Sequence, residues 1–266
     1  MINPLSPEKS SMQLQMEFEI AARYKSATQR ARVVTELWGE RNLYCAVCDS
    51  PSLVRFSPNV QAVDYSCPEC HSLFQLKSQS SAFSRRIIDA GYEAMRRAIS
   101  DDRTPNLIAV HYDPSCWKIR NVLLVPRFAF SMSAVEKRKP LAATARRAGW
   151  IGCNILLCNI PEDARIDLVR DGIAVDPKNV RHRYSQLIPL AGFNTELRGW
   201  TLDVLRVARS LGKRHFSLAE MYAHDAELVS LHPANRNVRP KIRQQLQRLR
   251  DMGLIEFVRP GYYRCS

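Results

Sequence analysis

Two pairs of cysteines are the residues of this chain whose types and spacing point most directly to chemistry. Cys45 and Cys48 form the first pair, Cys67 and Cys70 form the second, and eighteen residues separate the pairs. Four thiolates at this spacing are typical of a tetrahedral zinc site, the alternative being four buried free thiols. Because four protein ligands leave no coordination position open to substrate, we expect a structural zinc ion and not a catalytic one.

A second candidate metal site lies in the same segment of the chain. Asp64 precedes the second cysteine pair, and Gln75 and Lys77 lie two residues apart in a predicted strand over 73–78, so they share one face of it. Phosphodiester hydrolysis needs a divalent ion held by oxygen ligands, an activated water and a positive charge near the transition state. The predicted ligands of Mg²⁺ are Asp64, the side-chain carbonyl of Gln75 and the main-chain carbonyl of Leu76. Lys77 would orient the water or stabilise the developing charge.

The glutamine weakens this second prediction. Gln75 offers the ion one neutral oxygen where a glutamate would offer a full negative charge, so the affinity for metal should fall. Glu36, in a helix predicted over 28–40, could supply a further carboxylate, although we expect it on the surface. An isolated aspartate followed by a polar residue and a lysine also fits an ordinary solvated strand face.

The chain as a whole is strongly basic, with a formal net charge of +13 and a pI near 9.6. Such an excess favours an anionic partner, meaning nucleic acid or an acidic membrane surface. No segment approaches the roughly 20 apolar residues of a membrane span. Residues 1–12 lack the apolar stretch of a secretory signal and are predicted to be a loose extension.

Strands and helices alternate after the first cysteine pair, as in an α/β domain. Besides the helix over 28–40 and the strand over 73–78, the apolar patterns predict helices over 13–24 and 84–99, strands over 107–112 and 122–125, and a hairpin from 166–169 and 172–174. Ser26 and Gln29 are predicted to form a capping box. A linker is expected near 190–197.

The stretch 136–154 is basic and rich in small residues, and we predict a loop there. Arg146 and Arg147 could contact phosphates or guanine edges, and Trp150 could stack on a base or press against a methyl group. Burial of the tryptophan in the core is the alternative.

The last seventy residues predict a winged helix. Helices are expected over 200–211, after Ser217 (which begins a capping box) and over 240–252, followed by a hairpin from 254–258 and 262–264. Residues 196–266 contain thirteen Lys or Arg and seven Asp or Glu, so this part is basic by itself. The helix over 240–252 would read a major groove, unless it is a solvated face or a protein-docking module. Its candidate DNA-binding residues are Lys241, Arg243, Gln244 and Gln247.

From about residue 20 to its end, the chain resembles the DpnI or Dam-replacing family of endonucleases. Two stretches carry the resemblance: Arg-Lys-Pro-Leu-Ala over 138–142 with Thr-Ala-Arg-Arg-Ala-Gly-Trp-Ile-Gly-Cys-Asn over 144–154, and Lys-Ile-Arg-Gln-Gln-Leu over 241–246 with residues 249–251 and 255–257. The cysteine pairs and residues 63–64, 76–78 and 198–201 match as well.

The resemblance implies a mixed α/β fold with a PD-(D/E)xK nuclease core over 13–192, a zinc site inserted at 45–70 and a winged-helix domain over 196–266. It also implies Mg²⁺-dependent cleavage of double-stranded DNA at GATC carrying N6-methyladenine, by a type II restriction endonuclease of the bacterial cytoplasm. Asp64 and Lys77 correspond to catalytic positions and Trp150 to the methyl-sensing residue. A monomer is favoured.

Gln75 departs from the pattern of the wider PD-(D/E)xK nuclease superfamily, which has an acidic residue there. The alternative prediction is therefore a methyl-adenine DNA-binding protein with weakened or lost cleavage. A nuclease with relaxed or altered sequence choice is a third and weaker alternative.

Overall fold

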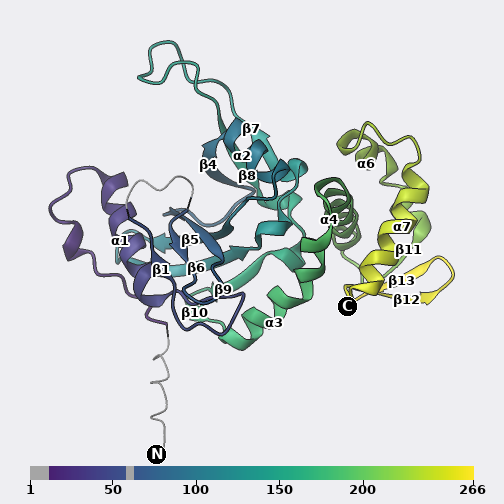
Figure 1. Cartoon of the computed structure of the whole chain (residues 1–266), viewed down its shortest axis with the longest axis horizontal. Coiled ribbons are helices and arrows are strands. Elements are labelled where there is room, and N and C mark those ends of the chain that lie inside the picture. The colour runs from purple at the N-terminus through teal and green to yellow at the C-terminus, as the bar shows by residue number, and fades with distance from the viewer. Residues whose placement is uncertain (1–11, 58–62) are drawn as a thin grey trace, which may run out of the picture. The chain divides into compact units, whose positions relative to one another are not determined.

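A computed structural model describes residues 12–57 and 63–266 and groups them into two compact units (Figure 1). The first contains the chain up to Ala82, together with Leu107–Leu124 and Asp167–Arg181. The second contains Phe83–Asn106, Val125–Ile166 and His182–Ser266. The loose extension predicted over 1–12 lies, except for Met12, outside the described residues. Among the described helices, none combines the length and the apolar character that a membrane crossing requires.

The first unit is built on a seven-stranded sheet in the order β1-β2-β3-β5-β6-β9-β10. Its strands are β1 Val54–Arg55, β2 Tyr65–Ser66, β3 Leu73–Gln79, β5 Asn106–Asp113, β6 Lys118–Val125, β9 Ile166–Arg170 and β10 Ile173–Ala174. The predicted strands at 73–78, 107–112 and 122–125 and the predicted hairpin at 166–174 are therefore confirmed. β5 is buried without interruption from Asn106 to Val110, which is typical of a strand covered on both faces.

Helix α1 (Ala27–Asn42) confirms the predicted helix over 28–40 and buries Val34, Thr35 and Trp38. Ser26 occupies its N-cap, but its side chain accepts no capping hydrogen bond, so the predicted capping box is wrong. The hydroxyl of Tyr65 in β2 donates a 2.7 Å hydrogen bond to the main-chain carbonyl of Glu36. This bond ties the middle of α1 to the strand that follows Asp64.

The helix predicted over 13–24 is wrong. Only a single 3-10 turn, η1 (Glu19–Ala21), forms there, and before it Gln15 forms an isolated antiparallel bridge with Lys118. The amide of Met16 donates to the carbonyl of Trp117 at 2.9 Å, and the amide of Ile119 donates to the carbonyl of Leu14 at 2.8 Å. The sequence Gln-Leu-Gln-Met-Glu-Phe over 13–18 alternates polar and apolar residues, and that period suits an extended edge and not a helix.

The second unit contains a small sheet in the order β4-β8-β7, formed by β4 Arg86–Gly91, β8 Gly152–Leu156 and β7 Val135–Lys137. β4 corrects the helix predicted over 84–99, since helix α2 begins only at Tyr92 and ends at Ser100. Ile87 is buried whereas Ile88 is 64% exposed, an alternation that a strand produces and a helix does not. β7 and β8 likewise shorten the loop predicted over 136–154 to residues 138–151.

Helix α3 (Pro177–Leu187) lies in a stretch for which no element was predicted. Its buried residues are Val180, Tyr184 and Leu187, at the i, i+4, i+7 spacing of one helical face. Short 3-10 turns complete the connections: η2 Arg127–Ala129, η3 Met132–Ala134, η4 Leu157–Asn159, η5 Glu162–Ala164 and η6 Ile188–Gly192.

The C-terminal part of the second unit confirms the predicted helices and hairpin and adds two elements. Its members are α4 Thr195–Ser210, β11 His215–Ser217, α5 Leu218–Tyr222, α6 Asp225–Leu231, α7 Val238–Asp251, β12 Ile255–Arg259 and β13 Tyr262–Cys265. The three strands form one sheet in the order β11-β13-β12. Ser217 and Glu220 form the predicted capping box of α5, and Gly253, with a φ of 73°, follows the end of α7. The two added elements are helix α6 and strand β11, which were not predicted.

Helix α4 is largely buried, and among its charged residues Arg198 and Asp203 are buried while Arg209 is half-buried. Each of these pairs with a polar residue from an earlier part of the chain. The pairs are Arg198–Asp102 at 2.8 Å, Asp203–Ser133 at 2.7 Å and Arg209–Asp163 at 2.6 Å. Asp203 is further bound by His232 at 2.9 Å, whose ring stacks on Trp200. Charged pairs therefore attach α4 to the rest of the second unit.

Candidate metal centres and nucleic-acid interface

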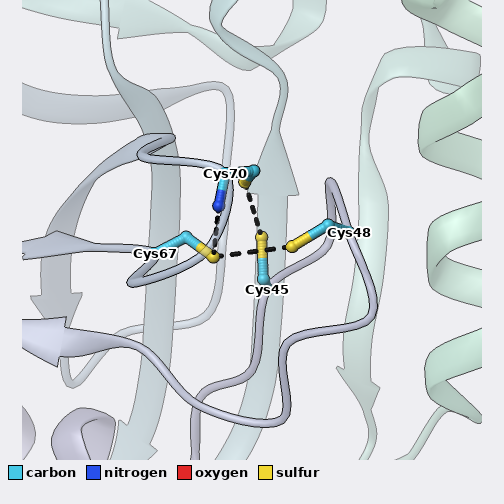
Figure 2. Close-up of side chains that lie close together, drawn as sticks. All are labelled: Cys45, Cys48, Cys67 and Cys70. Carbon is cyan, nitrogen blue, oxygen red and sulfur yellow. Dashed lines mark hydrogen bonds between the residues drawn. The ribbon is translucent and has the colours of Figure 1, made fainter.

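The four cysteines predicted to bind zinc converge on one point (Figure 2). Their sulfur atoms all lie within 4.8 Å of one another, with Cys45 Sγ 3.6 Å from Cys70 Sγ and Cys48 Sγ 3.5 Å from Cys67 Sγ. A tetrahedral ion with metal–sulfur bonds of about 2.3 Å would separate its ligands by about 3.8 Å, close to these spacings. The cluster is thus close enough to bind a metal and is consistent with structural zinc.

Main-chain amides donate hydrogen bonds to two of the cysteine sulfur atoms and so stabilise negative charge on them. The amide of Val47 donates to Cys45 Sγ at 3.3 Å, and the amide of Cys70 donates to Cys67 Sγ at 3.4 Å. Burial opposes ionisation of the Cys67 thiol, but the amides of Cys70 and Glu69 and the neighbouring thiols lower its pKa to about 6. Burial raises the pKa of Cys45 instead. One thiolate is therefore favoured before any ion binds, and an ion would favour the others.

Arg181 of α3 holds the first cysteine loop in place. Its Nε donates to the carbonyl of Cys45 at 3.0 Å, and its second guanidinium nitrogen donates to the carbonyl of Ser50 at 3.3 Å. The same guanidinium lies over the ring of Tyr44 and 3.5 Å from a carboxylate oxygen of Asp49. The Arg181 side chain therefore joins the cysteine cluster to helix α3.

Asp64 lies beside the Gln75-Leu76-Lys77 segment of β3, as predicted for the second site. Strands β2 and β3 pair antiparallel with Tyr65 opposite Phe74, and Asp64 immediately precedes β2. The amide of Asp64 donates to the carbonyl of Phe74 at 2.9 Å. In return, the amide of Leu76 donates to Oδ2 of Asp64 at 2.7 Å. The Asp64 carboxylate is thereby held at the main chain of Leu76, between Gln75 and Lys77 in the strand.

The burial of the triplet differs in one respect from the sequence prediction. Gln75 is 9% exposed, whereas Leu76 and Lys77 are half-buried. The alternation of the strand predicted over 73–78 would place the Leu76 side chain in the core, but it is only half-buried. Phe74 is fully buried, while Leu76 contributes its main-chain amide to the carboxylate.

Glu36 is not on the surface, contrary to the prediction. It is only 7% exposed, and its carboxylate forms ion pairs with Arg32, whose Nε lies 2.6 Å from Oε1, and with Arg55. Arg32 lies four residues before Glu36 in α1, a helical spacing that the sequence already displays. Arg55 in β1 was missed because nothing in the sequence connects it with α1. The structure thus adds a buried carboxylate and two arginines to the surroundings of Asp64.

These charges act on the Asp64 carboxyl. Burial raises its pKa above the ordinary value, and the hydrogen bond from the Leu76 amide opposes that rise. The charge of Glu36 raises the same pKa further, whereas Lys77 and Arg32 lower it. Glu36, Lys77 and Arg32 are therefore the charged neighbours that act on the pKa of the Asp64 carboxyl. A cation near Asp64 would relieve the remaining cost of its negative charge.

Residues 138–151 form a loop that Figure 1 shows extending away from β7 and β8. Arg146 and Arg147 are exposed, and Trp150 is half-buried at the base of the loop. The guanidinium of Arg147 lies 4.6 Å from the centroid of the Trp150 ring. The three candidate DNA-contacting residues of this loop are therefore accessible, and Trp150 belongs neither to the core nor to open solvent.

Helix α7 separates apolar and polar residues as predicted. Ile242, Leu246 and Leu249 are fully buried. Of the candidate DNA-binding residues, Arg243, Gln244 and Gln247 are exposed and Lys241 is half-buried. Arg243 also donates to the hydroxyl of Tyr222 in α5 at 2.9 Å, which fixes one end of this polar face.

Comparison with known protein families agrees with these features. Residues 12–191 match the family described as DpnI, the Dam-replacing family. Residues 196–265 match the domain described as the Dam-replacing HTH domain. The two matches together cover nearly all of the chain and confirm the resemblance drawn from the sequence. The chain belongs to the Dam-replacing (DpnI) family of restriction endonucleases and carries the family's helix-turn-helix domain at its C-terminal end.

Proposed function

We propose that this protein is a methylation-dependent type II restriction endonuclease that cleaves double-stranded DNA at GATC containing N6-methyladenine. The observation that carries the proposal is the hydrogen bond that holds the Asp64 carboxylate against the strand of Gln75 and Lys77, in a chain of the Dam-replacing family. We assign the catalytic site to a PD-(D/E)xK core, within a catalytic domain over 13–192 and before a winged-helix domain over 196–266.

The catalytic ion in this proposal is Mg²⁺. A carboxylate, a side-chain amide oxygen and a main-chain carbonyl are hard oxygen donors, which suit this ion. They would come from Asp64, Gln75 and Leu76. When bound, Mg²⁺ lowers the pKa of a coordinated water and withdraws charge from the scissile phosphate. Lys77, on the strand face of Gln75, orients the attacking water in line with the leaving oxygen or stabilises the charge that develops.

Zinc in this proposal has a structural task only. Cys45, Cys48, Cys67 and Cys70 would fill its four coordination positions, so no position remains for water or substrate. Asp64 lies three residues before Cys67. The two residues between them form β2, which pairs with β3. The ion would therefore stabilise the strand pair that presents Asp64 to Gln75.

Two surfaces of the second unit would read the DNA. In the loop over 138–151, Arg146 and Arg147 contact phosphates or guanine edges, and Trp150 contacts the adenine methyl group. In α7, the reading residues are Lys241, Arg243, Gln244 and Gln247. One methyl contact contributes on the order of 1 kcal/mol. Two independent readings therefore multiply the discrimination. The setting we propose is the cytoplasm of a bacterium, with the protein acting as a monomer.

A second candidate function is a methyl-adenine DNA-binding protein with weakened or lost cleavage. The amide of Gln75 favours it, because a neutral oxygen at the metal site weakens Mg²⁺ binding. The binding surfaces of the second unit would be unaffected by such a loss.

A single plasmid distinguishes the two functions. It is prepared with and without adenine methylation at GATC and incubated with the protein and Mg²⁺. Cleavage of the methylated plasmid alone supports the endonuclease. Cleavage of neither plasmid, with tighter binding to a methylated GATC duplex than to the unmodified duplex, supports the binding protein. Cleavage of both removes the methyl dependence from the proposal.

A further inference from the structure

Trp150 lies against two glycines that face each other across neighbouring strands. Gly91 ends β4, Gly152 begins β8, and the two are register partners. A Cβ atom added at Gly152 would come 2.9 Å from both Cη2 and Cζ3 of the Trp150 indole. At Gly91 it would come 3.6 Å from Nε1 of the same ring. The indole thus occupies the space that two side chains would otherwise fill.

The backbone does not require glycine at either position. Gly91 has φ −67° and ψ 134°, an extended conformation that any residue adopts. Gly152 pairs with Gly91 within the same ladder and is not among the glycines with positive φ. What Gly152 requires is therefore the absence of a side chain, because the Trp150 ring uses the space, whereas a methyl group at Gly91 would only touch the ring.

The main chain around Trp150 is fixed on both sides. The amide of Leu141 donates to the carbonyl of Trp150 at 2.9 Å, and the amide of Arg138 donates to the carbonyl of Gly152 at 3.0 Å. The amide of Tyr92 donates to the carbonyl of Ile151 at 3.1 Å. With the backbone held in this way, the direction of the indole depends on what its ring packs against. The paired glycines lie on its strand side, and the Arg147 guanidinium lies over the ring.

We propose that Gly152, assisted by Gly91, is a positioning residue that sets the orientation in which the Trp150 indole meets the methyl group of N6-methyladenine. This inference rests on the proposed function, because it assigns Trp150 the methyl contact. Gly152 itself touches no DNA in this proposal. A ring held in one orientation before binding loses less conformational freedom when it contacts the base, which favours discrimination.

The test uses the full chain with Gly152→Ala, Gly91→Ala and the control Gly192→Ala. Among the described residues, nothing lies within 4 Å of a Cβ built at Gly192, so its substitution should have no effect. The readout is the ratio of dissociation constants for unmethylated and methylated GATC duplexes. Gly152→Ala should lower this ratio about fivefold, as loss of one methyl contact would. Gly91→Ala, with ordinary contact distances, should lower it less.

A second pair of variants separates positioning from general damage. Gly152→Ala combined with Trp150→Phe should recover part of the ratio, because phenylalanine lacks the indole atoms nearest the new methyl group. In a Trp150→Ala background, Gly152→Ala should change neither the ratio nor the melting temperature. An unchanged ratio in Gly152→Ala alone, or an equal effect of it with and without the Trp150 ring, would overturn the positioning role.

The proposed function fails in a different way. A wild-type protein that binds both duplexes equally would remove the methyl contact from Trp150 and with it this inference. The coupling between residues 150 and 152 in melting temperature would still report whether the glycine pair supports the ring. If residues 150 and 152 show no such coupling while the wild-type protein still discriminates between the duplexes, only the positioning role of Gly152 and Gly91 is excluded.

Discussion

The main-chain amide of Leu76 donates a 2.7 Å hydrogen bond to Oδ2 of Asp64, and so joins the carboxylate to the strand that carries Gln75 and Lys77. A carboxylate held by a main-chain donor keeps one orientation without any contribution from neighbouring side chains. This bond turns residues that are eleven or more positions apart in the sequence into one local arrangement. Five experiments test what the arrangement and its surroundings do.

Asp64→Asn removes the only full negative charge that we assign to the Mg²⁺ ligands. Cleavage of methylated plasmid should fall by at least about a hundredfold, which corresponds to about 2.7 kcal/mol of activation free energy. Binding of methylated duplex should be retained, as a gel-shift titration without Mg²⁺ would show. Asp171→Asn, at an exposed turn of the first unit, is the matched control and should cleave normally. Equal cleavage by the two variants would exclude Asp64 from catalysis.

Gln75→Glu supplies the negative charge that the wild-type residue lacks. The concentration of Mg²⁺ needed for half-maximal cleavage should fall, because an ionised oxygen binds the ion more strongly than an amide oxygen. Gln79→Glu adds the same charge further along β3 and should leave the Mg²⁺ requirement unchanged. Cleavage that appears only in Gln75→Glu, with an inert wild type, would establish the binding-protein alternative.

Acidification should inhibit cleavage at a higher pH than an ordinary aspartate would produce. Burial raises the pKa of Asp64, so its carboxyl takes up a proton earlier as the pH falls, and the protonated form does not bind Mg²⁺. Protons and Mg²⁺ then compete for one group. Raising the Mg²⁺ concentration should therefore move the acidic limb of the pH–rate profile to lower pH. An acidic limb that is independent of Mg²⁺ would assign it to a different group.

Cys48→Ser should remove one zinc ligand and lower the melting temperature of the protein. A structural zinc site contributes to folding directly, and the cluster connects the segment before β2 to the sheet. Metal analysis should give one zinc per wild-type chain and less in the variant. Cys158→Ser, at an exposed cysteine outside the cluster, should retain both zinc and stability. A wild-type protein that contains no zinc and keeps its melting temperature in a chelator would contradict this assignment.

Lys241→Ala tests the role of α7. If Lys241 contacts a phosphate, the affinity for DNA should fall similarly for methylated and unmethylated duplexes, and the slope of log affinity against log salt should decrease by about one unit. Gln247→Ala, on the exposed face of the same helix, should change sequence preference more than salt dependence if it reads a base edge. Unchanged binding by both variants would leave α7 as a solvated face.

Much of this structure could be predicted from the sequence because the relevant signals are local. The spacing within each cysteine pair, the strand over 73–78 and the Ser217–Glu220 capping box are each encoded within a few neighbouring residues, and the structure has the cysteine cluster, the strand and the capping box. The failures share a cause. β4 is a strand because β8 pairs with it, and residues 14–16 form no helix because they hydrogen-bond to residues 117–119, so a long-range partner decided both outcomes.

The candidate site likewise combines a feature that the local sequence predicts with contacts that only the folded structure reveals. The position of Asp64 beside Leu76 follows from the short antiparallel pairing of β2 with β3, which a strand beside a cysteine pair already suggests. The burial of Glu36 and its ion pair with Arg55 join a helix to a strand nineteen residues later, and no periodicity in the sequence encodes that contact. The glycine pair beside Trp150 is also invisible until β4 and β8 are known to be partners.

The burial of α4 has a practical consequence for anyone dissecting the protein. A cut near residue 195 would produce two fragments that look like separate modules in the sequence. It would leave Arg198 and Arg209 on one fragment and their partners Asp102 and Asp163 on the other, and it would remove the Ser133 hydroxyl from Asp203. An isolated C-terminal fragment should consequently be poorly soluble and prone to aggregate, and each half would need the other, even supplied as a separate polypeptide, to be recovered in folded form.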